Sequence, residues 1–372
     1  MVQKGGGSIF VYIFALPVWA VAFIAGILCG PFARQHFFII LVALVVSFFA
    51  LYRKYTWATL VIFGFICGIA RTFFGNIIRI PEHTLFTDVR DVCDRVFAVY
   101  LENPYRTLIS GILFGGTSGF DADWRYIFRA TGTMHIVAVS GSNVSFVVRW
   151  IEWALNRIPC APHMRFYIIA TGIAIFIFIT GAPASVIRAG IMGCIMYFSP
   201  LVGRRPSALH ALGAAAACMV LINPTVACDV GFQFSCLATL GLIIFEKPEG
   251  SFFSVVSETI AATLFVLPLE IFYFHVMSMS ALIANIIVTP FVPLLMCLGI
   301  TTLAAHFFAP FVITPVAYGA YVVAFIFLKT LEFIARIPGS LAQVETGWTV
   351  VVAAYSTLII YSINRVAARC RF

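Results

Sequence analysis

Charged residues are scarce in this sequence. Only 10% of its 372 residues are Asp, Glu, Lys or Arg, whereas 62% are hydrophobic and the mean hydropathy is +1.03. A soluble domain carries about 25% charged residues, and no soluble core could bury this much apolar surface. The composition excludes a soluble globular protein. It predicts an all-α, polytopic membrane protein with about 10–12 transmembrane or re-entrant helices.

Several functional motifs are also missing. No G-x-x-x-x-G-K-[ST] loop occurs around any of the four Lys residues, so we expect no built-in nucleotide motor. The ten Cys include no C-x-x-C pair and mostly fall in apolar runs, which indicates buried free thiols. No metal-binding H-x-H-x-D-H pattern is present. We therefore expect no metal, no cofactor and no enzymatic activity.

Apolar runs of helical length recur along the chain. They lie near 8–30, 37–51, 57–78, 134–151, 165–181, 184–201, 207–223, 230–246, 253–274, 281–308, 311–335 and 348–364. The 37–51 run is short enough to be re-entrant, and Pro290 and Pro293 could divide 281–308 into two half-helices. Loops rich in Lys and Arg alternate with loops that hold few. This bias predicts a multi-pass protein of the plasma (inner) membrane with both termini in the cytoplasm.

The segment from 80 to 133 has a different composition, with seven of the fifteen acidic residues. Val92, Val96, Val99 and Tyr100 recur at helical spacing, which predicts an amphipathic helix. Its apolar face could lie at the outer membrane interface or pack against the bundle. We therefore divide the chain into N-terminal transmembrane helices (1–79), external interfacial amphipathic helices (80–133) and a transmembrane channel domain (134–372).

Ionisable residues inside the apolar runs are candidates for a site, because each costs several kcal/mol in hydrocarbon unless it is paired or hydrated. Arg188 follows a helix break at Gly181 and Pro183. It could snorkel to the surface, pair with Asp229 or contact a passing anion. Asp229 could equally cap its own helix. His135 could be a hydrogen-bonded core residue or a ligand.

The run at 134–151 carries an unusual interruption, "SGSN", from Ser140 to Asn143. Such residues allow the backbone to unwind beside a water-filled cavity, or they allow two helices to approach closely. Further breaks are expected at 180–184 and 285–293. Several broken spans in one chain predict a pathway through the bundle, as in a pore or transporter.

Two other functions compete with a pore. The stretch "AVSGSN" is similar to a serine-hydrolase nucleophile site, but Ala138 stands where that motif has Gly, and His135 lies only five residues from Ser140. A secondary transporter for a small anionic solute would also bind at broken helices. Inverted repeats would favour a transporter, and we find none.

Four blocks, in this order, resemble the competence domain of the ComEC family, the inner-membrane channel for single-stranded DNA in natural transformation. They read "GTMHIVAVSGSNVSFV", "ASVIRAGIMGCIMYFSPLVGRRPSALHALGAAAACMVLINP", "DVGFQFSCLATLGLIIF" and "MSMSALIANIIVTPFVPLLM". The matching region runs from roughly Leu113 to Met296. The resemblance and the polarity pattern together select these pathway residues: His135, Ser140, Gly141, Asn143, Arg188, Asp229, Gln233, Ser235, Asn285 and Pro290. Asn143 departs from the family, because many members have His there, and Asn cannot titrate near neutrality.

The resemblance implies a channel for single-stranded DNA, with a homodimer as one arrangement. A single Arg188 among amides and hydroxyls suits conduction better than tight binding. Longer members carry an external OB-like domain and a metallo-β-lactamase-like domain. Here the external segment is short, and only "NRVAARCRF" follows the last run. We expect a conduit in the lipid bilayer that depends on a separately encoded DNA receptor, nuclease and cytoplasmic ATPase.

Overall fold

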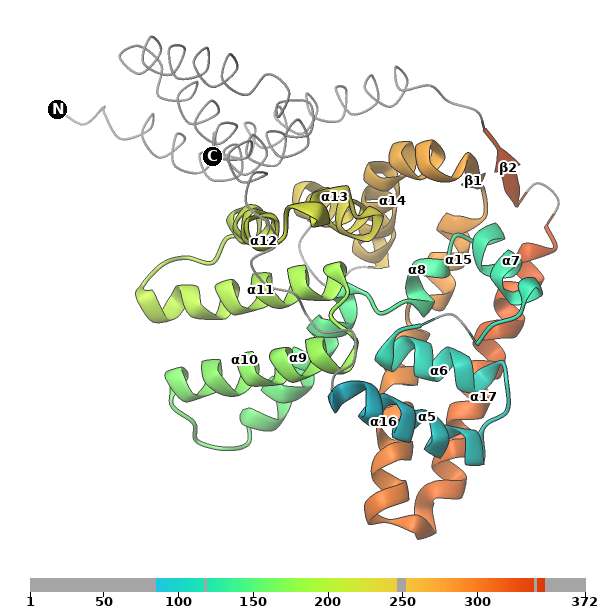
Figure 1. Cartoon of the computed structure of the whole chain (residues 1–372), viewed down its shortest axis with the longest axis horizontal. Coiled ribbons are helices and arrows are strands. Elements are labelled where there is room, and N and C mark those ends of the chain that lie inside the picture. Colours follow the sequence, from blue (N-terminus) through green and yellow to red (C-terminus); the bar gives the residue numbers. More distant parts are fainter. Residues whose placement is uncertain (1–84, 117–118, 246–251, 338–339, 345–372) are drawn as a thin grey trace. The chain divides into compact units, whose positions relative to one another are not determined.

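The computed structural model describes residues 85–116, 119–245, 252–337 and 340–344 (Figure 1). The predicted runs near 8–30, 37–51, 57–78 and 348–364 lie outside the described residues. The same holds for the predicted N-terminal transmembrane helices (1–79) and for both chain ends. The expected location of both chain ends in the cytoplasm stays a prediction.

Helices make up most of the described chain. They are α5 (Leu85–Tyr100), α6 (Tyr105–Phe114), α7 (Ala122–Ala130), α8 (Met134–Val137), α9 (Gly141–Leu155), α10 (Pro162–Ile179), α11 (Ala184–Phe198), α12 (Ala208–Ile222), α13 (Val230–Phe245), α14 (Phe252–Phe274), α15 (Ala281–Val288), α16 (Phe291–Phe308) and α17 (Ile313–Ala335). Short 3-10 helices are η1 (Ser199–Val202), η2 (Pro224–Cys228) and η3 (Pro310–Val312). Strands β1 (Val276–Ser278) and β2 (Leu341–Gln343) pair antiparallel, with Met277 opposite Ala342.

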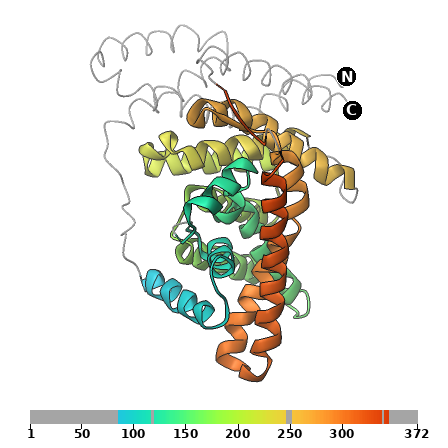
Figure 2. The ribbon, with the colours of Figure 1, turned by 90° about the vertical axis from the view of Figure 1, so that its right-hand side faces the viewer.

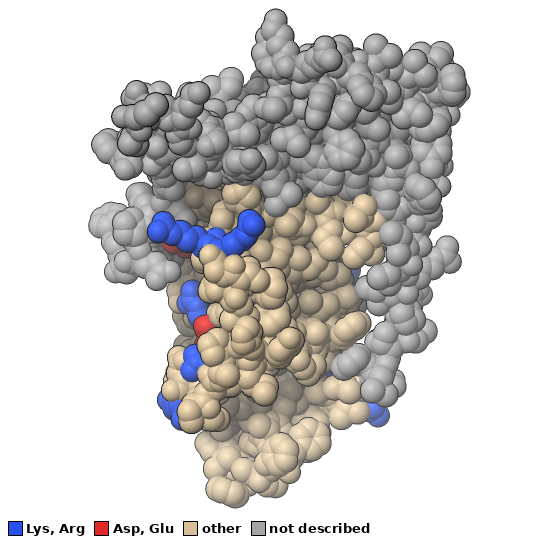
Figure 3. All heavy atoms as spheres, turned by 90° about the vertical axis from the view of Figure 1, so that its left-hand side faces the viewer, with Lys and Arg blue, Asp and Glu red and all other residues tan. Residues whose placement is uncertain are grey.

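The helices confirm the expected all-α membrane class. Five stretches are long and apolar enough to span a bilayer: Pro162–Ile179, Ala184–Val202, Val256–Phe274, Phe291–Phe308 and Pro310–Ala335. Large apolar side chains remain exposed on them, including Met164, Tyr167 and Phe178 of α10. In the face shown in Figure 3, only small basic and acidic areas interrupt the uncharged side chains. Such a surface suits contact with lipid, and the chain is a polytopic membrane protein.

The chain divides into two compact units. Within the described residues, the first unit contains Pro159–Ala170 and Ile187–Cys236. The second contains the described parts of His83–Ile158, Thr171–Val186 and Leu237–Phe372. Each unit is described by itself below.

The core of the second unit is built around α6 and the hairpin of α16 and α17, which lie side by side (Figure 2). Leu108, Ile109 and Ile112 of α6 are fully buried there. Gly299 of α16 allows this close packing, because a Cβ at that position would lie 2.7 Å from Leu113 Cδ1. The segment predicted to be interfacial therefore contributes its middle helix to a protein core. The location of that segment at a membrane interface stays a prediction.

The buried face of α5 differs from the predicted one. Val96 is 7% exposed and Phe97 is fully buried, whereas Val92 is 41% and Val99 is 70% exposed. Val92 and Val99 therefore do not pack against this unit, and their contact with a membrane interface stays a prediction. Several stripes of a helix can satisfy the same apolar spacing, and the larger area of the Phe97 ring favours the stripe that buries it.

The C-terminal end of α7 and the residues that follow it pack closely against the start of α15. Ser278 Oγ and Ser280 Oγ both donate to the carbonyl of Ala130, at 2.6 and 3.0 Å. Gly132 has φ +62, and a Cβ there would lie 2.6 Å from Ala281 Cβ. Two of the sequence blocks quoted above therefore meet in space through backbone groups that only small residues can expose.

Candidate functional site

The interruption near Ser140 is a helix break. α8 ends at Val137, Ala138 and Ser140 have extended backbone, and α9 begins at Gly141. The break therefore lies before most of the predicted Ser140–Asn143 stretch, and Gly141 to Asn143 form the first turn of α9. Ser140 precedes α9 in extended backbone, and its carbonyl accepts from the Asn143 N–H at 3.1 Å, so the chain turns into α9 at this residue without a side-chain cap.

Asn143 stabilises the end of another helix. Its side chain is 1% exposed, and Nδ2 donates to the Ile112 carbonyl at 2.8 Å. Ile112 belongs to the last turn of α6, where carbonyl groups have no partner within the helix. Oδ1 of Asn143 accepts from the Ser140 and Ser142 hydroxyls at 3.3 and 3.4 Å. The buried amide thus meets its donor and acceptor needs through protein groups.

Two other helix ends in the second unit have the same type of support. Arg90 Nη2 donates to the Gly115 carbonyl, just after α6, at 3.0 Å. Ser185 Oγ donates to the Val139 carbonyl, in the break after α8, at 3.3 Å. Non-helical backbone at membrane depth needs such partners, because hydrocarbon supplies none. Polar side chains from distant segments therefore stabilise these breaks by donating hydrogen bonds to their free carbonyl groups.

The break between α10 and α11 lies against the same region. Gly181 and Ala182 have positive φ values of 78° and 55°. A Cβ on Gly115 would lie 3.5 Å from both the Thr180 carbonyl oxygen and Val139 Cγ2. The end of α6 and the two breaks are therefore neighbours. We call these residues (115–116, 138–140 and 180–183) the helix-break junction.

The third predicted break divides the 281–308 run into two helices, as expected. α15 ends at Val288, and Pro290 precedes the first residue of α16. Asn285 lies in the last turn of α15 and is 8% exposed. Its Oδ1 atom is buried and has no hydrogen-bond partner within the part of the chain that the structure describes. A buried carbonyl oxygen without a donor is unfavourable, so Asn285 remains a candidate for contact with water or a passing molecule.

Arg188 is buried in the first unit without a carboxylate. It is 4% exposed; Nε donates to Ser235 Oγ at 2.9 Å, and Nη1 lies 3.0 Å from Met192 Sδ. No ion pair joins Arg188 to Asp229 among the described residues, so pairing, one of the alternatives left open by the sequence, is not formed. Burial of the side chain also argues against snorkelling to the surface.

Asp229 has the capping role that the sequence left open. Its Oδ1 accepts from the backbone N–H of Phe232 at 2.7 Å, in the first turn of α13. Gln233 Nε2 donates to the Ala227 carbonyl at 2.8 Å, at the end of η2. A carboxylate at a helix N-terminus satisfies a free N–H group and the helix dipole. Asp229 is therefore held by the N-terminus of its own helix rather than by Arg188.

The geometry offers no support for a hydrolase. His135 hydrogen bonds with the backbone of Gly132, and the Ser140 hydroxyl lies 2.6 Å from that of Ser142. In the described chain His135 and Ser140 form no hydrogen bond with each other, which a serine nucleophile and its base require. The expected lack of enzymatic activity stays a prediction.

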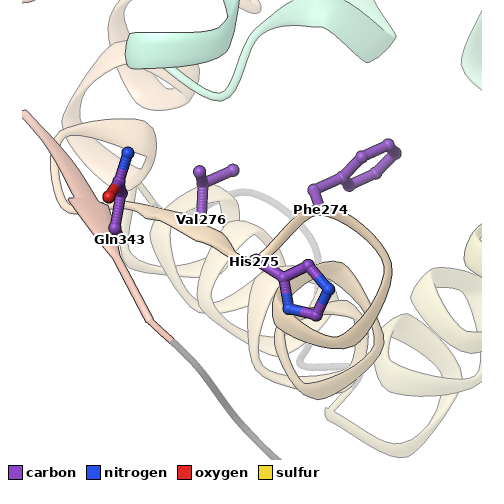
Figure 4. A pocket seen from close by; sticks show the side chains of 4 residues that line it. All are labelled: Phe274, His275, Val276 and Gln343. Carbon is purple, nitrogen blue, oxygen red and sulfur yellow. The ribbon is translucent and has the colours of Figure 1, made fainter.

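A shallow cavity of about 400 Å³ lies where α14 meets β1 (Figure 4). Its lining consists of Phe274, His275, Val276 and Gln343. Across the described residues, no group of three or more His, Cys, Asp or Glu side chains is placed to hold a metal ion. The cavity contains none of the residues that the sequence selected.

Comparison with known proteins decides the family. The family described as "Competence protein" matches residues 112–369 of this chain. The chain belongs to this competence protein family. The expected ComEC-type resemblance is thereby confirmed, and the matched segment includes every pathway residue selected from the sequence. Arg90 lies outside it.

Two relatives of the competence protein are distant. ComE operon protein 3 of Bacillus subtilis (strain 168) is 24% identical over 168 residues, which cover 44% of this chain and 22% of that protein. The uncharacterized protein YcaI of Escherichia coli (strain K12) is 24% identical over 219 residues, which cover 51% and 28%. The chain thus spans about a quarter of the length of these relatives. No solved structure matches it.

The structure also adds residues that the sequence analysis missed. Arg90 lies in a segment rich in charges, where no single Arg stands out, and Ser185 is one small residue among many. The signal in the sequence that could have indicated this place was its glycines, since Gly115, Gly116 and Gly181 all adopt positive φ. Only the fold brings these glycines to one place.

Proposed function

We propose that this competence protein forms a membrane conduit that conducts single-stranded DNA into the cytoplasm during natural transformation. Family membership supports a role in competence. The five apolar helices of spanning length support a location within the membrane. Passage of a strand is the part of the proposal that rests on the chemistry of the site.

The observation that carries this proposal is Arg188. This guanidinium is 4% exposed, and within the described residues its side-chain partners are a hydroxyl and a thioether, with no carboxylate to balance its charge. Such a group is costly in a dry interior, so it calls for water or an anion nearby. A DNA strand brings one phosphate per nucleotide and would supply that anion transiently. One cation, rather than many, lets each phosphate leave again.

Other groups could assist the strand without binding it tightly. No described residue donates to the Asn285 carbonyl oxygen, and a nucleobase amino group or a water molecule could do so. The Ser140 hydroxyl belongs to the helix-break junction, and the Ser142 hydroxyl lies 2.6 Å from it. Sequence-independent passage needs such weak, repeated polar contacts rather than base readout.

The proposal includes separate partners. We propose that a DNA receptor, a strand-degrading nuclease and a cytoplasmic ATPase are separate proteins, and that both termini face the cytoplasm. A homodimer could enclose the path. Purified protein with Mg²⁺, Mn²⁺ or Zn²⁺ should then leave labelled DNA intact. Cleavage that disappears on substitution of Asp121 or Asp123 would contradict a conduit without nuclease activity.

The decisive experiment is DNA passage into proteoliposomes that contain only this protein. A dye-labelled single strand is added outside, a potential positive inside the vesicle draws it in, and external nuclease removes what has not entered. We expect Arg188→Leu to lower passage at least about tenfold, which corresponds to about 1.4 kcal/mol. Arg188→Lys keeps the charge and should retain part of the passage.

A matched control separates this role from general charge loss. Arg149 of α9 is exposed, so Arg149→Leu removes the same charge from a different place and should change passage little. Equal membrane insertion of all three variants is verified first. Normal passage by Arg188→Leu, or none by the wild type, would refute the proposal. Uptake of labelled phosphate without any DNA passage would indicate a small-anion transporter instead.

A further inference from the structure

Arg90 of α5 reaches into the helix-break junction of the second unit. Its Nη2 donates to the Gly115 carbonyl at 3.0 Å. A Cβ on Gly116 would lie 3.5 Å from the same Nη2, and a Cβ on Gly181 would lie 3.3 Å from Nη1. The two glycines therefore leave the space that the guanidinium occupies. A Cβ at Gly181 would crowd the guanidinium, whereas one at Gly116 would lie in ordinary van der Waals contact with it.

The charge of Arg90 has no partner of opposite sign in the described chain. A guanidinium offers five N–H donors, and the Gly115 carbonyl takes one of them. Another arginine of this segment is placed differently. Arg106 lies 3.9 Å from the Asp94 carboxylate, which balances its charge. Arg90 thus combines partial burial, free donors and an uncompensated charge.

The local backbone strengthens the positive character of this place. Gly115, Gly116 and Gly181 all have positive φ, and the guanidinium lies beside the backbone of these three glycines. α11 begins at Ala184, soon after Gly181, and the first turn of a helix adds partial positive charge. A partly buried guanidinium next to exposed backbone is a favourable place for a group with several acceptor oxygens.

We propose that Arg90 binds a phosphodiester group of the passing strand at the helix-break junction. This inference rests on the proposed conduit and adds a second cationic contact outside the family-matched segment. The planar fork of Arg suits the paired oxygens of a phosphate. A lipid headgroup carries the same chemistry. The strand is favoured because Arg90 contacts the backbone of the junction, whereas Arg95, on the same helix, is exposed.

The test measures binding rather than passage. Protein in nanodiscs of neutral lipid is titrated with a fluorescent single-stranded oligonucleotide at several salt concentrations. Arg90→Gln keeps a donor for the Gly115 carbonyl but removes the charge. It should weaken binding about five- to tenfold. Loss of one phosphate contact should also lower the slope of log K against log salt by about 0.7. Arg95→Gln is the matched control and should change neither quantity appreciably.

A second measurement needs no variant. Phenylglyoxal modifies accessible arginines, and mass spectrometry locates the modified positions in the wild type. The oligonucleotide should protect Arg90 but not Arg95. Unchanged affinity and slope for Arg90→Gln, or equal labelling of Arg90 with and without the oligonucleotide, would overturn the inference. If passage into vesicles persisted in that case, the proposed conduit would stand without this contact.

Lipid is distinguished in the same experiment. Phosphatidylglycerol is added to the nanodiscs, and the lipid retained by each purified variant is measured by native mass spectrometry. We expect equal retention by the wild type and Arg90→Gln. Selective loss of phosphatidylglycerol from Arg90→Gln, with unchanged oligonucleotide binding, would assign the phosphodiester to a lipid and overturn the strand assignment.

Discussion

Asn143→Ala offers the sharpest test of how the breaks are stabilised. The substitution removes the amide whose Nδ2 donates to the Ile112 carbonyl at 2.8 Å. That carbonyl lies in the last turn of α6 and has no partner within the helix. Because Asn143 is 1% exposed, water cannot easily replace the lost donor. The end of α6 would be left with an unsatisfied buried acceptor.

The expected magnitude follows from two contributions. An orphaned buried acceptor costs about 1–3 kcal/mol. The space left by the missing amide adds about 1 kcal/mol, because the surroundings collapse only in part. The Ser140 and Ser142 hydroxyls lose their shared acceptor but keep each other, at 2.6 Å, so their share is small. We expect a total loss of about 2–4 kcal/mol, a large part of a typical stability of about 5–15 kcal/mol.

The assay is thermal unfolding of the purified protein in detergent, with three matched variants. Ser142→Ala alters an exposed neighbour and should cost less than about 0.5 kcal/mol. Asn143→His should fall between the wild type and Asn143→Ala, because neutral imidazole has one donor and one acceptor. Asn143→Asp should be the least stable, because it places a carboxylate oxygen against the Ile112 carbonyl.

The order of these variants can refute the reasoning. Equal stability of Asn143→Ala and Ser142→Ala would show that Asn143 does not cap α6. So would an Asn143→Asp protein as stable as Asn143→Ala. If Asn143→Ala were stable but no longer passed DNA, the amide would act on the strand itself rather than on the fold.

Three further predictions concern the same type of packing. Gly132→Ala should lower the free energy of unfolding by about 2–5 kcal/mol, because φ is +62 and the new Cβ would lie 2.6 Å from Ala281 Cβ. Thermal unfolding measures this change, and a neutral effect would contradict the close packing of Gly132 against Ala281. Ser278→Ala and Ser280→Ala should each lower stability only mildly, whereas the double variant should lower it by more than their sum, because the Ala130 carbonyl then loses both donors. A double-mutant cycle with simple additivity would count against shared capping of this carbonyl. Asp229→Ala should lower the free energy of unfolding by about 1 kcal/mol and Asp229→Asn by less, because both Asp and Asn cap helices. A stable Asp229→Asn protein that no longer passes DNA would instead give the carboxylate a role in the pathway.

Much of the helical organisation could be predicted from the sequence. Charge is too scarce for a soluble protein, so the membrane class follows from composition alone. Proline and glycine mark helix ends through local backbone chemistry. The break at Pro290 was predicted for this reason, as was the one at Gly181 and Pro183. These features need only neighbouring residues to be understood, which is why a linear sequence reveals them.

The partners of polar residues could not be predicted in the same way. The sequence left open whether Arg188 pairs with Asp229 or Asp229 caps its own helix, and in the structure Asp229 caps α13 while Arg188 contacts Ser235. On α5, helical spacing selected Val92, whereas packing buried Phe97. Each element offered several local solutions of similar energy. Contacts with distant segments decided among them.

The sequence by itself determined the membrane class, the main helices, the places where they break and the family resemblance. The tertiary structure alone decided what each break faces. It placed Asn143 on the carbonyl of Ile112 and Arg90 on that of Gly115, through segments that the sequence keeps apart. The physical reason is that a helix break creates unsatisfied backbone groups locally, but the donors that satisfy them come from wherever the chain folds back.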